Sequence, residues 1–196
     1  LDENFRLLRN RVQRLDRLIG GLVAYSRAGR GIFEEPKGLE LGSTPSLLEV
    51  CQTLAMGPFD EGAAAVRIVA GTGADKRLAN LSALRVVVWH LLANAACHAR
   101  VGTQAVHVTV SARSLGDTGS HCEVAFADDG LGIDPRHHAR VWGLFQTLES
   151  RDRCDTAGVG LAIVRRIVER NGGGVGLDSQ VGAGSTFRFT WPTVPA

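Results

Sequence analysis

Residues 122–133 read CEVAFADDGLGI, an apolar run that leads into two aspartates and two glycines. Such a run is typical of a strand that is paired within a sheet. Asp128 at the strand end can accept a hydrogen bond from an amino group such as that of adenine, and Gly130 and Gly132 let the backbone pass close to a flat ring. The stretch therefore predicts a strand that ends in a nucleotide-binding turn, with an ordinary Asp-Gly turn as the alternative.

Two later glycine-containing segments suit the same kind of ligand. Residues 158–161 read GVGL and open a predicted helix, where Gly158 and Gly160 would expose backbone N–H groups to a phosphate. No strand leads directly into them and no Lys-Ser/Thr pair follows, which excludes a Rossmann fingerprint and a P-loop. Residues 182–186 read GAGST and alone indicate only a hairpin turn. The long segment 130–158 has no clean periodicity and is expected to be a lid or binding loop.

A predicted helix places three polar side chains four residues apart, at His90, Asn94 and His98. An amide in an otherwise apolar helix needs a hydrogen-bonding partner, and the oxygen of Asn94 suits Mg²⁺. His90 is a second candidate ligand for that ion. A zinc site is not expected, because there is no H-E-x-x-H pattern and no acidic residue nearby. The alternative is a polar helix face bonded to neighbouring backbone.

The first thirty residues carry an apolar stripe whose members are alternately three and four residues apart. Arginines and acids fill the other face, and glycines 29 and 31 end the pattern. This spacing is that of a coiled coil or helical bundle, and it predicts a partner helix. A helix that packs on the core of its own domain is the alternative. The stripe consists of Phe5, Leu8, Val12, Leu15, Ile19 and Leu22.

The remaining segments show either the periodicity of a helix or the alternation of a strand. Residues 30–45 are predicted to be a linker with a short strand near residues 39–41. Helices are expected at 46–56, at 82–100 with Ser82 as N-cap, and at 159–170, and strands at 64–70, 106–112, 122–127, 175–179 and 185–191. The predicted fold class is α/β. It is a two-layer α/β sandwich with a mixed sheet and helices on one face, preceded by a long coiled-coil-type helix.

Composition narrows the classes of function. The 196 residues include 22 basic and 20 acidic ones, so neither nucleic-acid nor membrane binding is expected. No apolar run reaches the roughly 20 residues of a membrane span, and no signal peptide is evident, so a cytoplasmic location is expected. The four cysteines form no C-x-x-C pair and are expected to be reduced. Because the chain begins at Leu1 rather than Met, we expect it to be part of a longer protein.

Taken in order, these segments resemble the catalytic domain of sensor histidine kinases, in the gyrase–chaperone–kinase–mismatch-repair ATPase superfamily. Residues 90–95 (HLLANA) resemble the N box and residues 128–132 the G1 box. Phe145 matches the F box, residues 158–161 the G2 box, and residues 182–186 the last glycine turn. The four boxes in this order are specific, whereas each of them alone is weak.

Finer similarities refine this interpretation. Residues 144–148 (LFQTL), 150–152 (SRD) and 167–173 (IVERNGG) resemble the phytochrome-like and other PAS-linked sensors. Residues 18–27 resemble the second helix of the dimerisation hairpin that carries the phosphoacceptor. The resemblance thus implies three parts. Residues 1–29 would be that second helix without the first, residues 30–45 a linker, and residues 46–196 the ATP-binding catalytic domain.

The resemblance also implies roles for single residues. Asp128 would bind the adenine amino group, Asn94 would coordinate Mg²⁺ and act in catalysis, and His98 would lie near the ring or the phosphates. Gly158 and Gly160 would offer backbone to the phosphates. Further contacts to ATP are implied for Gly130, Gly132, Phe145, Arg151, Leu161 and Thr186. The reaction would transfer the γ-phosphoryl group to a histidine nitrogen. Implied partners are a response regulator receiver domain, the phosphoacceptor helix of the parent kinase and, in the full-length protein, a second copy.

The sequence departs from the family pattern at three positions. His90 stands for the first asparagine of the N box, and Cys97 and Thr147 stand where basic residues are usual, unless Arg151 or Arg153 replaces them. No histidine precedes His90, so the chain is not expected to autophosphorylate in the usual way. A degenerate, non-catalytic nucleotide-binding or scaffold domain is therefore the alternative. An ATP-hydrolysing relative is disfavoured because no acid lies between residues 85 and 100 to activate water. The leading helix argues against an anti-sigma serine kinase.

Overall fold

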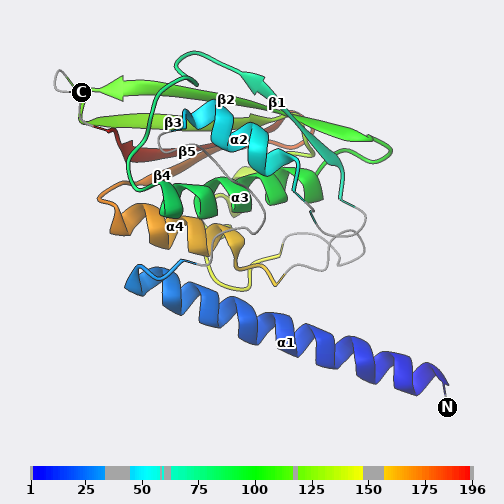
Figure 1. Ribbon diagram of the computed structural model, residues 1–196. Helices are drawn as coiled ribbons and strands as arrows, with labels where there is room; N and C mark the ends of the chain where they lie inside the picture. Colours follow the sequence, from blue (N-terminus) through cyan, green and yellow to red (C-terminus); the bar gives the residue numbers. More distant parts are fainter. Residues whose placement is uncertain are drawn as a thin grey trace.

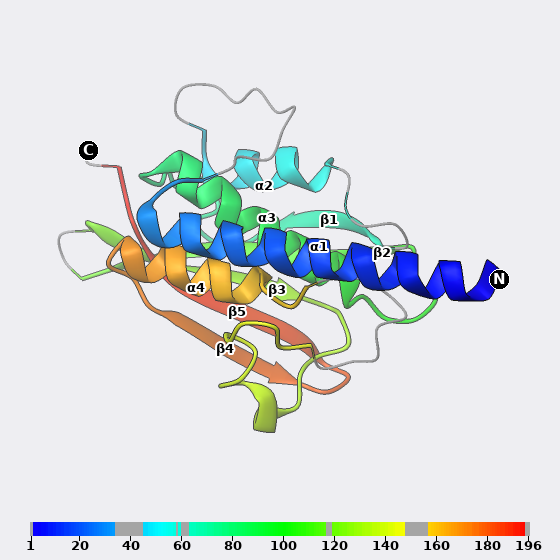
Figure 2. The same cartoon turned by 90° about the horizontal axis from the view of Figure 1, so that it is seen from below.

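The computed structural model describes residues 2–33, 45–57, 59, 63–116, 119–147 and 157–194. Within this part of the chain, one five-stranded sheet is covered on one face by three helices, and a longer helix lies outside them (Figures 1 and 2). This arrangement confirms the predicted α/β sandwich with helices on one face of the sheet. The predicted strand near residues 39–41 lies outside the described residues.

The sheet is mixed, with the strand order β1-β2-β3-β5-β4. Strand β1 (Ala65–Ala70) runs parallel to β2 (Ala105–Leu115), and every other neighbouring pair is antiparallel. Strands β3 (His121–Asp128) and β5 (Gly184–Pro192) lie side by side, and β4 (Val175–Gln180) forms the far edge. Asp128 therefore ends the middle strand of the sheet. The sequence predicts a paired strand that ends near Asp128, whereas it does not predict its central place.

Side chains alternate between the two faces of the sheet, because successive residues of a strand point to opposite sides. The face that meets the helices is apolar and buried, whereas the opposite face carries mostly polar side chains. The buried side chains of β2 and β5 are Val106, Val108, Val110, Phe187, Phe189 and Trp191. Helix α3 (Leu81–Cys97) supplies the other half of this core with residues such as Val87, Val88 and Leu92.

The start of α3 corrects one prediction. Ser82 lies inside the helix, and the N-cap is Asn80, in the left-handed conformation with φ 53° and no side-chain capping bond. The segment before the helix is held by long-range contacts. Asn80 donates from Nδ2 to Oδ1 of Asn171 at 2.6 Å, and Nε1 of Trp191 donates to the carbonyl of Ala79 at 2.7 Å. These tertiary bonds set the helix start against the local preference for serine. The helix also ends earlier than predicted, at Cys97.

Helix α2 (Leu47–Ala55) begins with a complete capping box. The hydroxyl of Ser46 accepts from the N–H of Glu49 at 3.3 Å, and the N–H of Ser46 donates to the Glu49 carboxylate at 2.7 Å. Replacement of Ser46 by Ala is expected to lower the free energy of unfolding by about 1 kcal/mol, as loss of a serine N-cap typically does. Chemical denaturation measures this. The control is Ser82→Ala, an exposed serine without a capping role, and equal losses in both variants would contradict the prediction.

The N-terminal helix α1 (Asp2–Arg30) has two different faces. The inner face packs on α4 (Gly160–Arg170) and consists largely of small residues, together with Tyr25. Ala28 is buried, Nη1 of Arg170 donates to the carbonyl of Gly29 at 3.2 Å, and a Cβ at Gly21 would lie only 2.8 Å from Val159. On the outer face, the whole predicted apolar stripe is solvent-exposed, from 49% at Leu22 to 66% at Phe5. Helix α1 therefore docks on its own chain with one side and leaves the apolar stripe uncovered.

Among the described residues, no helix combines the length and the apolar character that a membrane crossing requires.

Candidate functional site

The carboxylate of Asp128 is held at the end of β3 by two backbone donors. The N–H groups of Gly130 and Ser185 donate to the same oxygen, Oδ1, at 2.9 and 3.3 Å. Burial raises the pKa of Asp128, and these two bonds act in the opposite direction. Since both donors use Oδ1, Oδ2 remains to accept a hydrogen bond from a ligand.

Glycines around this carboxylate allow three backbone segments to meet without side chains between them. A Cβ at Gly130 would lie 2.7 Å from the carbonyl oxygen of His98. One at Gly132, where φ is 73°, would collide with the carbonyl of Gln180, and one at Gly184 with the carbonyl of Asp128. The predicted G1 box and last glycine turn are therefore packed directly against each other. This close packing explains the glycines independently of any ligand.

Helix α3 runs past both glycine regions. His90 lies beside the first residue of α4, because a Cβ at Gly160 would be 3.3 Å from its Nδ1. At the other end of the same helix, the carbonyl of His98 accepts from the N–H of Leu131 at 3.0 Å. The two contacts are eight residues apart, which is about 12 Å along a helix axis. Asn94 lies between them. It is half-buried, and its carboxamide makes no hydrogen bond to the described residues.

His90 and Cys97, two positions where the sequence differs from the family pattern, supply no positive charge to the site. Burial lowers the pKa of His90 to about 4, so its imidazole is neutral near pH 7. Cys97 is disulfide-bonded, whereas Cys51 and Cys122 are free. The expectation that the cysteines are reduced is therefore wrong for Cys97. The sulfur of Cys97 cannot supply the positive charge of the basic residue that is usual at this position.

The F and G2 boxes are joined by backbone contacts. The N–H of Gln146 donates to the carbonyl of Gly158 at 3.2 Å, and Nη2 of Arg140 donates to the Gln146 side chain at 3.1 Å. Phe145 is 45% exposed and has φ 59°, a conformation that bulky residues rarely adopt. Leu161 packs partly on the core. The predicted position of the G2 glycines at a helix start is confirmed, because α4 begins at Gly160.

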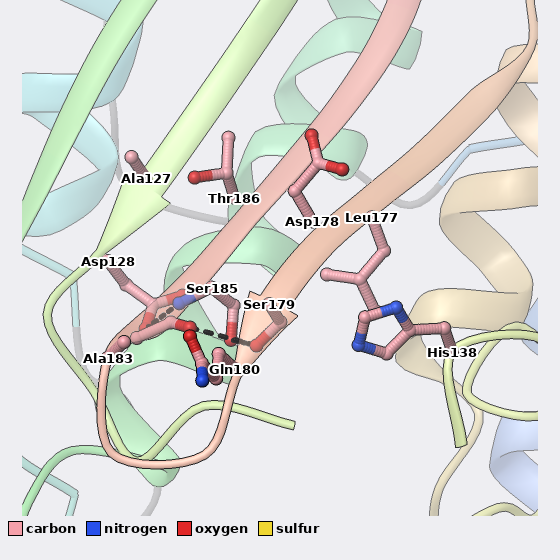
Figure 3. Close-up of a pocket in the computed structure, with 11 residues that line it drawn as sticks. Ala127, Asp128, His138, Leu177, Asp178, Ser179, Gln180, Ala183, Ser185 and Thr186 are labelled. Carbon is pink, nitrogen blue, oxygen red and sulfur yellow. Dashed lines mark hydrogen bonds between the residues drawn. The ribbon is translucent and has the colours of Figure 1, made fainter. Parts of the chain in front are cut away.

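The last glycine turn brings Ser185, rather than the predicted Thr186, next to Asp128. In the register of β3 and β5, Asp128 pairs with Ser185, and Ala127 pairs with Thr186. Thr186 therefore points to the other face of the sheet, away from Asp128 (Figure 3). Ser185 is buried, and its Oγ accepts from Ser179 Oγ at 3.0 Å. Ser185 lies two and four residues before the apolar Phe187 and Phe189, so the strand alternation in the sequence places it on the same buried face.

A hollow with a volume of about 520 Å³ lies at this end of β4 and β5. Asp128 and Ser185 form one part of its wall, and His138 closes another part from the segment that follows the G1 box (Figure 3). His138 comes directly after a 3₁₀ turn at Pro135–His137, which the sequence did not predict. The lining residues are Ala127, Asp128, His138, Leu177, Asp178, Ser179, Gln180, Ala183, Gly184, Ser185 and Thr186. Arg151 lies outside the described residues.

Three curated relatives are similar over parts of the chain. Cyanobacterial phytochrome A of Nostoc sp. is 45% identical over 65 residues, which cover 33% of this chain and 8% of that protein. The sensor histidine kinase AruS of Pseudomonas aeruginosa is 39% identical over 110 residues, or 54% and 11%. The signal transduction histidine-protein kinase BarA of Escherichia coli is 27% identical over 176 residues, or 88% and 19%. The chain thus spans less than a fifth of the length of these relatives.

Solved structures show the same fold. Full-length ShkA, crystallised in complex with AMPPNP, matches with a TM-score of 0.64 at 23% identity, over 100% of this chain and 40% of that one. The mycobacterial sensor histidine kinase MprB matches with a TM-score of 0.55 at 24% identity, over 67% and 86%.

A family model adds the decisive similarity, because it covers more than half of the chain. Residues 79–195 match the model described as histidine kinase-, DNA gyrase B- and HSP90-like ATPase. This range contains α3, the turn after Asp128, the start of α4 and the last glycine turn. The chain therefore belongs to the histidine kinase-, DNA gyrase B- and HSP90-like ATPase family, and its ATP-binding domain is of the sensor histidine kinase type.

Proposed function

We propose that this chain binds ATP with Mg²⁺ along helix α3 and transfers the γ-phosphoryl group to a histidine on a separate phosphoacceptor helix. One observation carries the proposal. The side chain of His90 on α3 meets the G2 glycine, and the carbonyl of His98, just past the helix end, accepts from the G1 turn. Asn94, whose amide makes no hydrogen bond to the described residues, lies between them. The spacing of about 12 Å suits a nucleotide that lies along the helix with its base at one end and its phosphates at the other.

At the base end, Asp128 would accept a hydrogen bond from the adenine amino group through Oδ2. Its other oxygen is already fixed by Gly130 and Ser185, so the free oxygen is held in place before the ligand arrives. Gly132 and Gly184 would keep the adjoining backbone in place. Such pre-organisation lowers the entropy that binding must otherwise lose.

At the phosphate end, the first turn of α4 at Gly160 offers N–H groups that no N-cap side chain bonds, and the positive end of the helix dipole. Mg²⁺ would be held by the oxygen of Asn94 together with phosphate oxygens, and it would neutralise charge on the transferred group. The described residues contain no group of three or more His, Cys, Asp and Glu side chains placed to hold a metal ion, which supports an ion that depends on the nucleotide. His90, being neutral, would contribute a ring nitrogen rather than a charge.

The test is calorimetric titration with a non-hydrolysable ATP analogue, with and without Mg²⁺. We expect Mg²⁺-dependent binding. A second assay supplies a phosphoacceptor hairpin as a separate chain together with labelled ATP, and we expect label on the hairpin and none on this chain. Absence of binding in the intact chain would contradict the proposal.

A degenerate domain that binds nucleotide without transferring phosphate is the second candidate. The neutral His90 and the disulfide-bonded Cys97 favour it, since neither supplies the positive charge that steadies a γ-phosphate. The same two assays separate the candidates, because binding without transfer supports the degenerate domain.

We further propose that the parent protein is a cytoplasmic homodimer that passes its phosphate to a response regulator receiver domain. The exposed stripe of α1 supports the dimer, since six apolar residues in a coiled-coil spacing are uncovered on the described chain. The receiver domain is the partner that this type of kinase implies.

The dimer makes its own prediction. Ile19→Lys puts a charge within the stripe, where Ile19 is 62% exposed, and is expected to weaken self-association about tenfold or more. Sedimentation equilibrium measures the dissociation constant. Gln13→Lys adds the same charge outside the stripe and serves as the matched control. Self-association that both variants retain unchanged would speak against pairing through this stripe.

A further inference from the structure

Arg100 bonds two loops that lie far apart in the sequence. It follows the C-terminal end of α3 and is exposed to solvent. Its Nε donates to the carbonyl of Asp129 at 2.9 Å and, more weakly, to that of Gly130 at 3.4 Å. Its Nη2 donates to the carbonyl of Gly182 at 2.8 Å. One guanidinium thus joins the turn after Asp128 to the last glycine turn.

The surrounding bonds are between backbone groups. Leu131 donates to the carbonyl of His98 at 3.0 Å, and Gly182 donates to the carbonyl of Leu131 at 2.6 Å. Together with Arg100, these bonds tie three segments into one frame: the end of α3, the turn that follows β3, and the turn between β4 and β5. Two further side chains bond across this frame. The Oγ of Ser179 accepts from the N–H of Ile133 at 2.8 Å and donates to the carbonyl of Gly184 at 2.8 Å, whereas Arg100 reaches the two turns from the end of α3.

We propose that Arg100 is a positioning residue for base recognition, which it serves from outside the pocket by fixing the peptide groups on either side of the Asp128 carboxylate. This inference rests on the proposed binding of adenine by Asp128. Asp129 and Gly130 directly follow the carboxylate, and Ser185, which donates to it, lies three residues after Gly182. Arg100 therefore holds both sides of the carboxylate in register.

The guanidinium suits this task because its N–H donors form a rigid planar fork. A lysine ammonium is a compact point charge on a flexible stem and cannot hold carbonyls of both loops in the same fixed geometry. Charged donors make the stronger hydrogen bonds of this kind. Arg100→Met should release both loops, and Arg100→Lys should restore function only in part.

The first experiment compares three ligands on the intact chain and on Arg100→Met: an ATP analogue, the matching inosine analogue, which lacks the exocyclic amino group, and inorganic tripolyphosphate. We expect Arg100→Met to bind the ATP analogue about tenfold more weakly, which corresponds to one lost charged hydrogen bond. Its affinity for tripolyphosphate should not change, so its preference for adenine over hypoxanthine should fall. Arg100→Lys should give an intermediate value.

Arg113→Met is the matched control, because Arg113 is another exposed arginine, 74% accessible and paired with Glu123 on the open face of the sheet. It should leave all three affinities unchanged. Equal losses for ATP and tripolyphosphate in Arg100→Met, or no loss at all, would overturn the proposal.

A second measurement needs no nucleotide. Hydrogen exchange of the free protein reports the amides of Leu131 and Gly182, both of which belong to the frame. We expect faster exchange at these amides in Arg100→Met and unchanged exchange in the core strands. Unchanged exchange throughout would overturn the role of Arg100. If exchange rises while the intact chain binds no nucleotide, the proposed function fails and the bonding role of Arg100 stands.

Discussion

Asp128→Asn is expected to weaken binding of an ATP analogue by about 100-fold, the largest loss of affinity for any single substitution in the site. Oδ1 already accepts from two N–H groups. An asparagine must turn its NH₂ either toward those two donors or toward the adenine amino group. Each orientation sets a donor against a donor, and an unsatisfied buried group costs about 1–3 kcal/mol in addition to the lost bond.

Calorimetry measures this loss, and thermal denaturation separates it from unfolding. Burial raises the pKa of Asp128 in the folded state above its unfolded value. A carboxyl group shifted in this direction favours folding at pH values below its unfolded pKa, and that contribution is lost as the pH rises through the folded pKa. At pH values above the folded pKa, the substitution therefore removes an unfavourable buried charge, and no loss of stability is expected there from the charge itself.

Glu123→Gln is the matched control for this prediction. Glu123 lies on the same strand, β3, outside the lining of the hollow, and its carboxylate pairs with Arg113 at 3.1 Å on the open face of the sheet. Surface ion pairs of this kind contribute little, so binding should be unchanged. If Asp128→Asn keeps its affinity while folded, the base does not bind through this carboxylate.

Asn94→Ala is expected to lower the rate of phosphoryl transfer to a supplied acceptor hairpin by about 100-fold or more, the range seen when one preorganised polar group is removed. The alanine removes the side-chain oxygen that would bind Mg²⁺, and the described residues offer no acidic or histidine cluster to replace it. Nucleotide binding should also lose its dependence on Mg²⁺. Labelled transfer and calorimetry at two magnesium concentrations measure the two effects.

Gln104→Ala removes an exposed carboxamide beyond the end of α3 and is the matched control. Asn94→Asp keeps an oxygen at the site but adds negative charge beside the phosphates, so it should bind Mg²⁺ and still transfer slowly. Transfer by Asn94→Ala at the rate of the unchanged chain would remove Asn94 from the mechanism.

Much of the fold follows from local periodicity. The alternation of apolar residues placed all five strands within about two residues of their ends, apart from β2, which runs on to Leu115, and the glycine turns marked where they meet. Predictions from local sequence were wrong where contacts with distant segments determine the structure, as at the start of α3. Ser82 has the residue type that usually caps a helix. However, Asn80 donates to Asn171 and Trp191 donates to the carbonyl of Ala79, and these two bonds fix the chain so that Asn80 is the cap.

The candidate site shows the same division. Asp128 and Asn94 stand out because a polar residue at a strand end or in an apolar helix needs a partner. Ser185 could not be predicted because its local sequence is that of an ordinary turn. Only the register of β3 and β5 places it opposite Asp128. Arg100 gave no signal at all. Its acceptors are 29, 30 and 82 residues away, and nothing in the local sequence connects them.

Two close backbone contacts limit which substitutions this site can accept. Gly132 packs against the carbonyl of Gln180, and Gly184 packs against the carbonyl of Asp128. These two contacts join main chain to main chain, so they do not depend on the identity of the other side chains that line the pocket. Ligand preference can therefore drift through the wall residues while these two contacts stay constant. A single added methyl group at either glycine, by contrast, has no room, so these two positions are closed to every other residue type.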